Sequence, residues 1–189
     1  MERLMKQLSI IVLFALSPLL AIGEAPREVV LGNMENIGMV IDVPDARFYD
    51  GVKLQVWEYY STGQNQTFYL DFLDNDTVII EAEFLKEKAF DVTDGVIQNN
   101  QPVQLWYVHP QSNIQKWKLD YVDEYFVFRS CLDNNYVLAV ESPVQNGSKV
   151  VIQRFTGEMN QKWVIMPYKD ERYKALFDEY KALHDKARK

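Results

Sequence analysis

Short runs of β-branched and aromatic residues, separated by turn residues, fill most of the chain between residues 24 and 167. Runs of about four to eight such residues, bounded by Gly, Asn and Asp, are typical of strands, and helical periodicity is nearly absent from this region. The pattern predicts strands over residues 29–31, 39–41, 53–57, 68–72, 77–80, 103–108, 117–121, 125–129, 136–140, 149–154 and 163–166. The fold class that follows is all-β.

The predicted strands fall into a threefold repeat. A Gln followed two residues later by an aromatic occurs at Gln66, Gln115 and Gln161, at separations of 49 and 46 residues. An Asp precedes the first two by 24 residues, at Asp42 and Asp91. Constant offsets of this kind indicate one structural unit repeated three times. Three units of about four strands make about twelve strands, as in a closed β structure with few open edges.

The first 23 residues have the pattern of a targeting segment. Arg3 and Lys6 precede an apolar run over residues 10–22, and small residues lie at its end. A membrane-spanning helix needs roughly 20 apolar residues, and this run is shorter. We expect residues 1–23 to be a secretory signal peptide cleaved after Gly23. The mature protein would then be secreted, either extracellular or periplasmic in a Gram-negative bacterium, without membrane insertion.

The last 22 residues, 168–189, are rich in charge and in helix formers. An apolar stripe at helical spacing predicts an amphipathic helix. The stripe consists of Tyr173, Leu176, Phe177, Tyr180 and Leu183. The segment carries seven basic and five acidic residues, whereas the whole chain has a net charge of −7. Two interpretations stay open: the helix docks on the acidic body, or it holds a second protein subunit.

Charge and composition exclude several classes of function. An acidic surface repels phosphate backbones, so nucleic acid is not an expected partner. The chain has two histidines, His109 in a predicted loop and His184 in the tail, and a single cysteine, Cys131. These three residues provide no metal cluster and no Cys–His pair. The sequence also contains no glycine-rich loop of the kind that binds phosphate. We therefore predict no cofactor and no metal. Cys131 cannot form an internal disulfide, and we expect it to be buried or, alternatively, paired with another chain.

Catalysis by two carboxylates needs two acids at a suitable separation. The most prominent candidates, Asp42 and Asp91, belong to different repeats and are expected to lie too far apart to cooperate. The sequence therefore predicts a protein that is not an enzyme.

Each of the three Gln-x-Trp or Gln-x-Phe motifs follows a strand whose sequence is an apolar residue, then Asp or Ala, then Val. This combination resembles the ricin B-type β-trefoil lectins over residues 27–167. The resemblance implies a β-trefoil of three repeats of about 46 residues, placed here in a domain over residues 24–167. It also implies that the motif aromatics Phe68, Trp117 and Trp163 lie in the core and that each motif Gln braces a turn.

A sugar site needs an aromatic surface for the C–H face of the ring and carboxylate or amide groups for its hydroxyls. The first repeat has all of these, and they match the lectin motif: Asp42, Gln55, Trp57, Asn65 and Gln66. The resemblance implies that the Asp accepts hydrogen bonds from ring hydroxyls, that the Trp stacks on the ring, and that the amides complete the polar rim. It also implies galactose, N-acetylgalactosamine or a related glycan as the ligand.

The other two repeats depart from this motif. The second keeps four of the residues, Asp91, Gln104, Trp106 and Gln115, but has Ile114 in place of Asn65. Losing a polar partner costs about 1–3 kcal/mol, and a millimolar site is worth only about 4 kcal/mol, so this site should be weak or silent. The third repeat has Ala139 at the Asp position, with Val151 and Gln153 in place of the Gln and Trp, and should only support the fold.

The sequence leaves three hypotheses for function. The first is a secreted lectin that recognises galactose-like sugars mainly through its first repeat. The second is a non-catalytic cell-binding subunit of a multi-subunit toxin or secreted assembly, with its partner held by residues 168–189. The third is a protein-binding or inhibitor scaffold whose sugar sites have degenerated.

Overall fold

The computed structural model describes residues 28–60, 63–74, 76–123, 125–168 and 178 of the 189-residue chain. The predicted signal peptide, residues 1–23, and the predicted helical tail lie outside the described residues, apart from Tyr168 and Asp178 in the tail. None of the helices within these ranges is long and apolar enough to cross a membrane.

The described residues form twelve strands, four in each repeat, and five short 3-10 helices. The strands of the first repeat are β1 (Glu28–Asn33), β2 (Asn36–Asp42), β3 (Gln55–Glu58) and β4 (Phe68–Phe72). Those of the second are β5 (Thr77–Ala82), β6 (Lys88–Val92), β7 (Gln101–Tyr107) and β8 (Lys116–Val122). Those of the third are β9 (Tyr125–Ser130), β10 (Tyr136–Val140), β11 (Val150–Arg154) and β12 (Trp163–Pro167). The 3-10 helices are η1 (Pro44–Ala46), η2 (Gln64–Gln66), η3 (Thr93–Gly95), η4 (Asn113–Gln115) and η5 (Met159–Gln161).

The all-β fold class and the expected strand number are confirmed within the described residues. Every predicted run overlaps a strand. β6 is absent from the predicted runs, although the apolar, Asp, Val motif before Gln115 falls in it. This strand is short, begins in a charged stretch and contains Asp91, so its local pattern is weak for a strand. Its pairing with β7 over five residue pairs stabilises it regardless.

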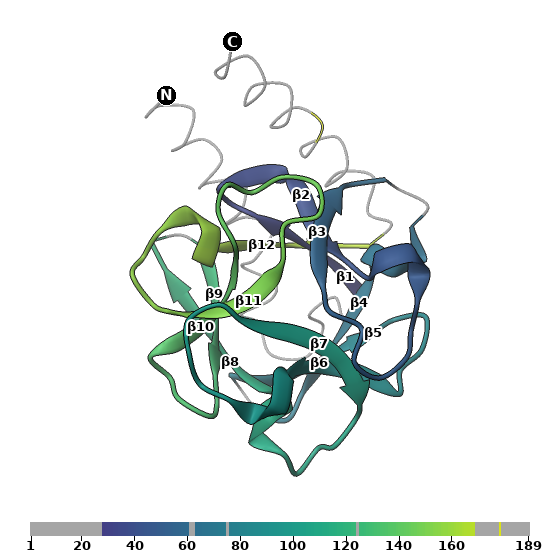
Figure 1. Cartoon of the computed structure of the whole chain (residues 1–189), viewed down its shortest axis with the longest axis vertical. Helices are drawn as coiled ribbons and strands as arrows, with labels where there is room; N and C mark the ends of the chain where they lie inside the picture. The colour runs from purple at the N-terminus through teal and green to yellow at the C-terminus, as the bar shows by residue number, and fades with distance from the viewer. Residues whose placement is uncertain (1–27, 61–62, 75, 124, 169–177, 179–189) are drawn as a thin grey trace.

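Antiparallel pairing closes six of the strands into a barrel. The ring runs β1–β4–β5–β8–β9–β12 and returns to β1. The hairpins β2–β3, β6–β7 and β10–β11 supply the other six strands, one hairpin from each repeat. Figure 1 shows the three repeats placed around a common centre. This is the β-trefoil arrangement that the resemblance implied, and ring closure leaves the barrel without open edges.

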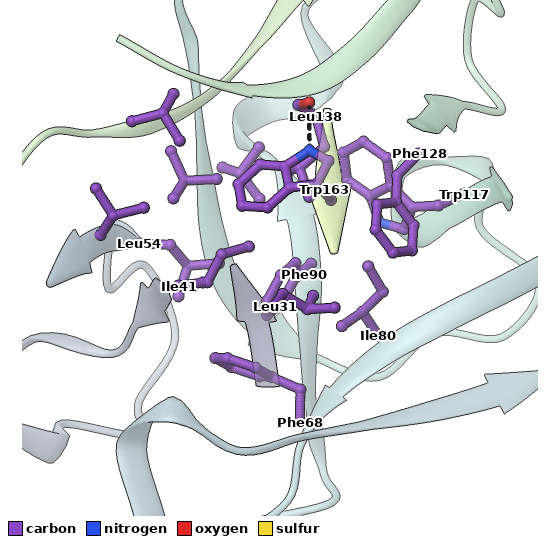
Figure 2. Close-up of a cluster of buried hydrophobic side chains, with 14 of the residues drawn as sticks. Leu31, Ile41, Leu54, Phe68, Ile80, Phe90, Trp117, Phe128, Leu138 and Trp163 are labelled. Atoms are coloured by element: carbon purple, nitrogen blue, oxygen red, sulfur yellow. Dashed lines mark hydrogen bonds between the residues drawn. The ribbon is translucent and has the colours of Figure 1, made fainter. Parts of the chain in front are cut away.

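The barrel core contains one aromatic from each Gln-x-aromatic motif. Phe68, Trp117 and Trp163 are all fully buried, which confirms their predicted place in the core. Figure 2 shows them among aliphatic and aromatic side chains from all three repeats. The indole Nε1–H of Trp163 donates to the Leu138 carbonyl oxygen at 3.0 Å, the dashed line in Figure 2. The Phe68 ring meets Phe90 edge-on, with centroids 4.9 Å apart.

The Gln of each motif braces the loop that follows the third strand of its repeat. Gln66 donates through Nε2 to the Glu58 carbonyl oxygen at 3.1 Å and accepts at Oε1 from the Tyr60 backbone N–H at 3.1 Å. Gln115 makes the same pair of bonds with Tyr107 and His109, and Gln161 makes it with Arg154 and Thr156. Because these bonds satisfy loop backbone groups in every repeat, the motif Gln has a structural role wherever it occurs.

Cys131 departs from its predicted burial. The residue follows β9 and is half-buried rather than fully buried. This partial burial raises the pKa of its thiol, which keeps the group protonated and poorly nucleophilic.

Candidate functional site

In the first repeat, four of the five predicted site residues meet at one carboxylate. Asp42, at the end of β2, pairs across the hairpin with Gln55, whose Nε2 donates to Asp42 Oδ1 at 2.9 Å. Asn65 Nδ2 and Gln66 Nε2 donate to Asp42 Oδ2 at 2.8 and 3.1 Å. Both amides lie on η2, which brings them beside the end of β2. The carboxylate thus organises the cluster, and Asp42 is 3% exposed.

These contacts leave few groups in the cluster free for a ligand. Asn65 uses both hydrogens of its Nδ2, which also donates to the Val43 carbonyl oxygen, and its Oδ1 accepts from the Tyr60 hydroxyl at 2.6 Å. An ionised carboxylate has about four acceptor positions, and Asp42 uses three of them. Gln55 Oε1 accepts no hydrogen bond from the described residues. One Asp42 position and Gln55 Oε1 therefore remain open as acceptors for a hydroxyl.

Trp57 lies on the surface beside these acceptors. It is 42% exposed and sits in β3 opposite Val40. Side chains two residues apart in a strand share a face, so Trp57 lies on the same side of β3 as Gln55. Asp42 is diagonal to Trp57 across the hairpin, a relation that places two residues about 7–8 Å apart and their Cβ atoms somewhat closer. The first repeat thus places an exposed aromatic ring within one sugar ring's reach of a carboxylate and an amide.

Burial raises the pKa of Asp42 above the ordinary value of an exposed aspartate. The hydrogen bonds from Gln55 and Gln66 oppose this effect by stabilising the charged form, and the nearby charge of Asp45 adds to it. The acceptor that a sugar hydroxyl would use is therefore easier to protonate than an exposed carboxylate.

We expect acid to weaken sugar binding without weakening the fold through this residue. As the pH falls through the raised pKa of Asp42, its carboxylate loses acceptor capacity, so affinity for the galactose-like sugar that the sequence predicts should fall. The folded protein binds more protons than the unfolded chain in that window, so protonation of Asp42 raises the free energy of unfolding. Galactose titrations of the wild type, and urea unfolding of the wild type and Asp42→Asn, over the same pH range measure the two effects. Constant affinity across the window would contradict this expectation.

The second repeat has an equivalent carboxylate cluster, but one of its three amides is replaced by an apolar side chain. Asp91 accepts from Gln104 Nε2 at 2.9 Å and from Gln115 Nε2 at 3.1 Å. Trp106 is 40% exposed, close to the value for Trp57. Ile114 packs against the core and offers Asp91 no donor. The four predicted residues of the possible weaker site therefore keep the hydrogen-bonded carboxylate and the exposed ring but lack the third amide.

A lysine from the first repeat also enters this second cluster. Lys53 Nζ donates to Gln104 Oε1 and, at 2.8 Å, to Thr93 Oγ1. The equivalent oxygen in the first repeat, Gln55 Oε1, is the one that stays open. Sequence reasoning missed Lys53 because it belongs to another repeat and reaches Gln104 through a β-bridge between repeats.

The third repeat has neither the carboxylate nor the exposed ring. Ala139 and Val151 are fully buried, and Gln153 Oε1 accepts from Asn160 Nδ2 at 3.0 Å. Across the described residues, no group of three or more His, Cys, Asp or Glu side chains is placed to hold a metal ion.

Tyr60 is a second residue that the sequence did not reveal. Its hydroxyl orients Asn65, and its ring lies over Gly63, where a Cβ would come within 2.4 Å of the ring. The equivalent positions in the other repeats, as the motif Gln contacts define them, are His109 and Thr156. Because the repeats do not share an aromatic there, the threefold pattern contains no signal for it.

The chain matches the model of the ricin-type beta-trefoil lectin domain over residues 28–167. Among curated proteins, the main hemagglutinin component type C of Clostridium botulinum C phage is 33% identical over 73 residues, which cover 36% of this chain. The match spans only 26% of that relative's length.

Two solved structures show the same fold. The designed three-fold symmetric protein ThreeFoil has a TM-score of 0.67 and 25% identity, over 74% of this chain and 97% of that one. The earthworm R-type lectin C-half, solved in complex with GalNAc, has a TM-score of 0.59 and 19% identity, over 75% and 98% of the two chains.

Proposed function

Because the chain belongs to the ricin-type beta-trefoil lectin family, a family of carbohydrate-binding domains, we propose that it recognises galactose-like sugars mainly through its first repeat. The observation that carries the proposal is the exposed Trp57 beside Asp42 and Gln55, both of which keep an acceptor open. In the second repeat Lys53 occupies the corresponding amide oxygen.

The chemistry of a galactose-like ring suits these groups. The C–H face of the ring would stack on the Trp57 indole, and neighbouring hydroxyls would donate to Asp42 and Gln55 Oε1. The choice of galactose or N-acetylgalactosamine comes from the family resemblance and is consistent with the GalNAc held by the earthworm lectin.

The test is retention of the mature chain, residues 24–189, on immobilised galactose and its elution by free galactose. Trp57→Ala should abolish retention because the ring loses its stacking surface. Trp106→Ala, which removes the similarly exposed indole of the second repeat, is the matched control and should be retained like the wild type. Retention that free galactose does not compete, or that survives Trp57→Ala, would refute the proposal.

We also propose that the protein acts by binding rather than catalysis, after export directed by residues 1–23. The support is the family, whose domains are generally non-catalytic, and the leader-like opening of the chain. Mass spectrometry of the exported protein should give a mature N-terminus at Glu24.

A second candidate function is a cell-binding subunit of a secreted assembly. The relative that is named as a hemagglutinin component favours it, and residues 168–189 would hold the partner. Deletion of residues 168–189 should then lower the solution mass of the assembly and leave galactose binding intact. An unchanged mass together with an unchanged set of partners would count against this candidate.

A further inference from the structure

We propose that the third repeat, which has no sugar site of its own, positions the stacking tryptophan of the first repeat through the turn at Asn146 and Gly147. The inference rests on the proposed sugar binding by the first repeat and identifies both as positioning residues for that site. The first site is then built by two repeats rather than one.

The third repeat covers the outer edge of β3. On its inner side, β3 pairs with β2. On its outer side, Gly147 N donates to the Val56 carbonyl oxygen at 2.9 Å, and Val56 N donates to the Ser148 carbonyl oxygen at 2.9 Å. Val150 N adds a bond to the Leu54 carbonyl oxygen at 3.0 Å. In Figure 1 the green segment between β10 and β11 passes beside β2 and β3.

One contact of this turn lies next to Trp57 in the chain, and a second lies at its ring. The Asn146 side-chain Oδ1 accepts from the backbone N–H of Glu58, the next residue after Trp57, at 2.7 Å. A Cβ on Gly147 would lie 3.9 Å from Cζ3 of the Trp57 indole, so the turn backbone runs close to the ring. Gly147 has a φ of +84°, a conformation that a side chain would strain. An exposed ring held in this way loses less conformational freedom when a sugar stacks on it.

The second repeat makes the same clamp on the third. Asn99 Oδ1, from the second repeat, accepts from the Arg154 backbone N–H at 2.7 Å, and Asn100 N donates to the Ile152 carbonyl oxygen at 2.9 Å. Asn99 is therefore the threefold equivalent of Asn146, but the strand that it holds, β11, has Gln153 where β3 has Trp57. The chain thus contains a matched control in which the clamp has no sugar-stacking ring to position.

The test compares Asn146→Ala, Asn146→Asp and Asn99→Ala in the mature chain. Asn146→Ala should weaken galactose binding by about threefold to tenfold, the effect of one lost hydrogen bond. Asn99→Ala should lower the unfolding midpoint by about as much as Asn146→Ala does, but it should leave the galactose Kd unchanged. Asn146→Asp keeps an oxygen acceptor and should restore the affinity.

A second measurement does not depend on sugar. NMR order parameters of the Trp57 indole N–H and hydrogen exchange of the Glu58 amide should report a looser ring and a faster exchange in Asn146→Ala, and no change in Asn99→Ala. Wild-type order in Asn146→Ala would overturn the inference whether or not the protein binds galactose. If the wild type binds galactose and Asn146→Ala binds it equally well, the positioning role fails and the proposed function stands.

Discussion

Asp42→Asn should abolish detectable galactose binding, with a loss of affinity of at least about 100-fold. Hydrogen bonds to a charged acceptor contribute about 1.5–3 kcal/mol each, and a millimolar site is worth only about 4 kcal/mol in all. The substitution removes that charge and also turns an amide NH2 either toward the donor from Gln55 or toward the donors from Asn65 and Gln66. Isothermal titration calorimetry with galactose measures the effect.

Asp91→Asn is the matched control for this experiment. It disturbs the equivalent cluster in the second repeat, where Gln104 and Gln115 donate to the carboxylate, so its cost in stability should be similar. Its galactose affinity should nevertheless equal that of the wild type, because Lys53 already occupies the Gln104 oxygen. The reverse result, with binding lost only in Asp91→Asn, would move the sugar site to the second repeat.

Trp163→Ala should lower the free energy of unfolding by about 3–5 kcal/mol, the usual cost of truncating a buried aromatic. The indole is fully buried in the barrel core, and its loss also leaves the Leu138 carbonyl oxygen without its donor. Since domains of this size are stable by about 5–15 kcal/mol, the variant should sit near the limit of folding. Urea unfolding followed by circular dichroism measures the change.

Substitution of the core tryptophans by Phe separates the contribution of the buried ring from that of the indole hydrogen bond. Trp163→Phe removes the donor to Leu138, whereas Trp117 Nε1 is buried without a hydrogen-bond partner among the described residues. Trp117→Phe should therefore cost less than Trp163→Phe, and the first repeat already has Phe68 at this position. Equal costs for both substitutions would show that the indole hydrogen bond contributes nothing to stability.

Much of the fold could be predicted because its packing requirement recurs. The Gln-x-aromatic motif appears in all three repeats because each repeat must place an aromatic in the barrel and brace one loop. Local alternation and turn residues then locate the strands. The predicted runs omit β6 because that strand depends on its pairing with β7 more than on its own composition.

The sequence by itself determined the all-β class from its strand-like runs, the threefold plan from the spacing between repeats, and the five candidate residues of the first repeat from their match to the lectin motif. Only the tertiary structure decided which acceptors stay open. Lys53 reaches Gln104, and the turn at Asn146 reaches the strand of Trp57, across the boundaries between repeats. Such contacts join residues about 50 to 90 positions apart through strand pairing and turn geometry, and pairing partners leave no periodic trace in the chain.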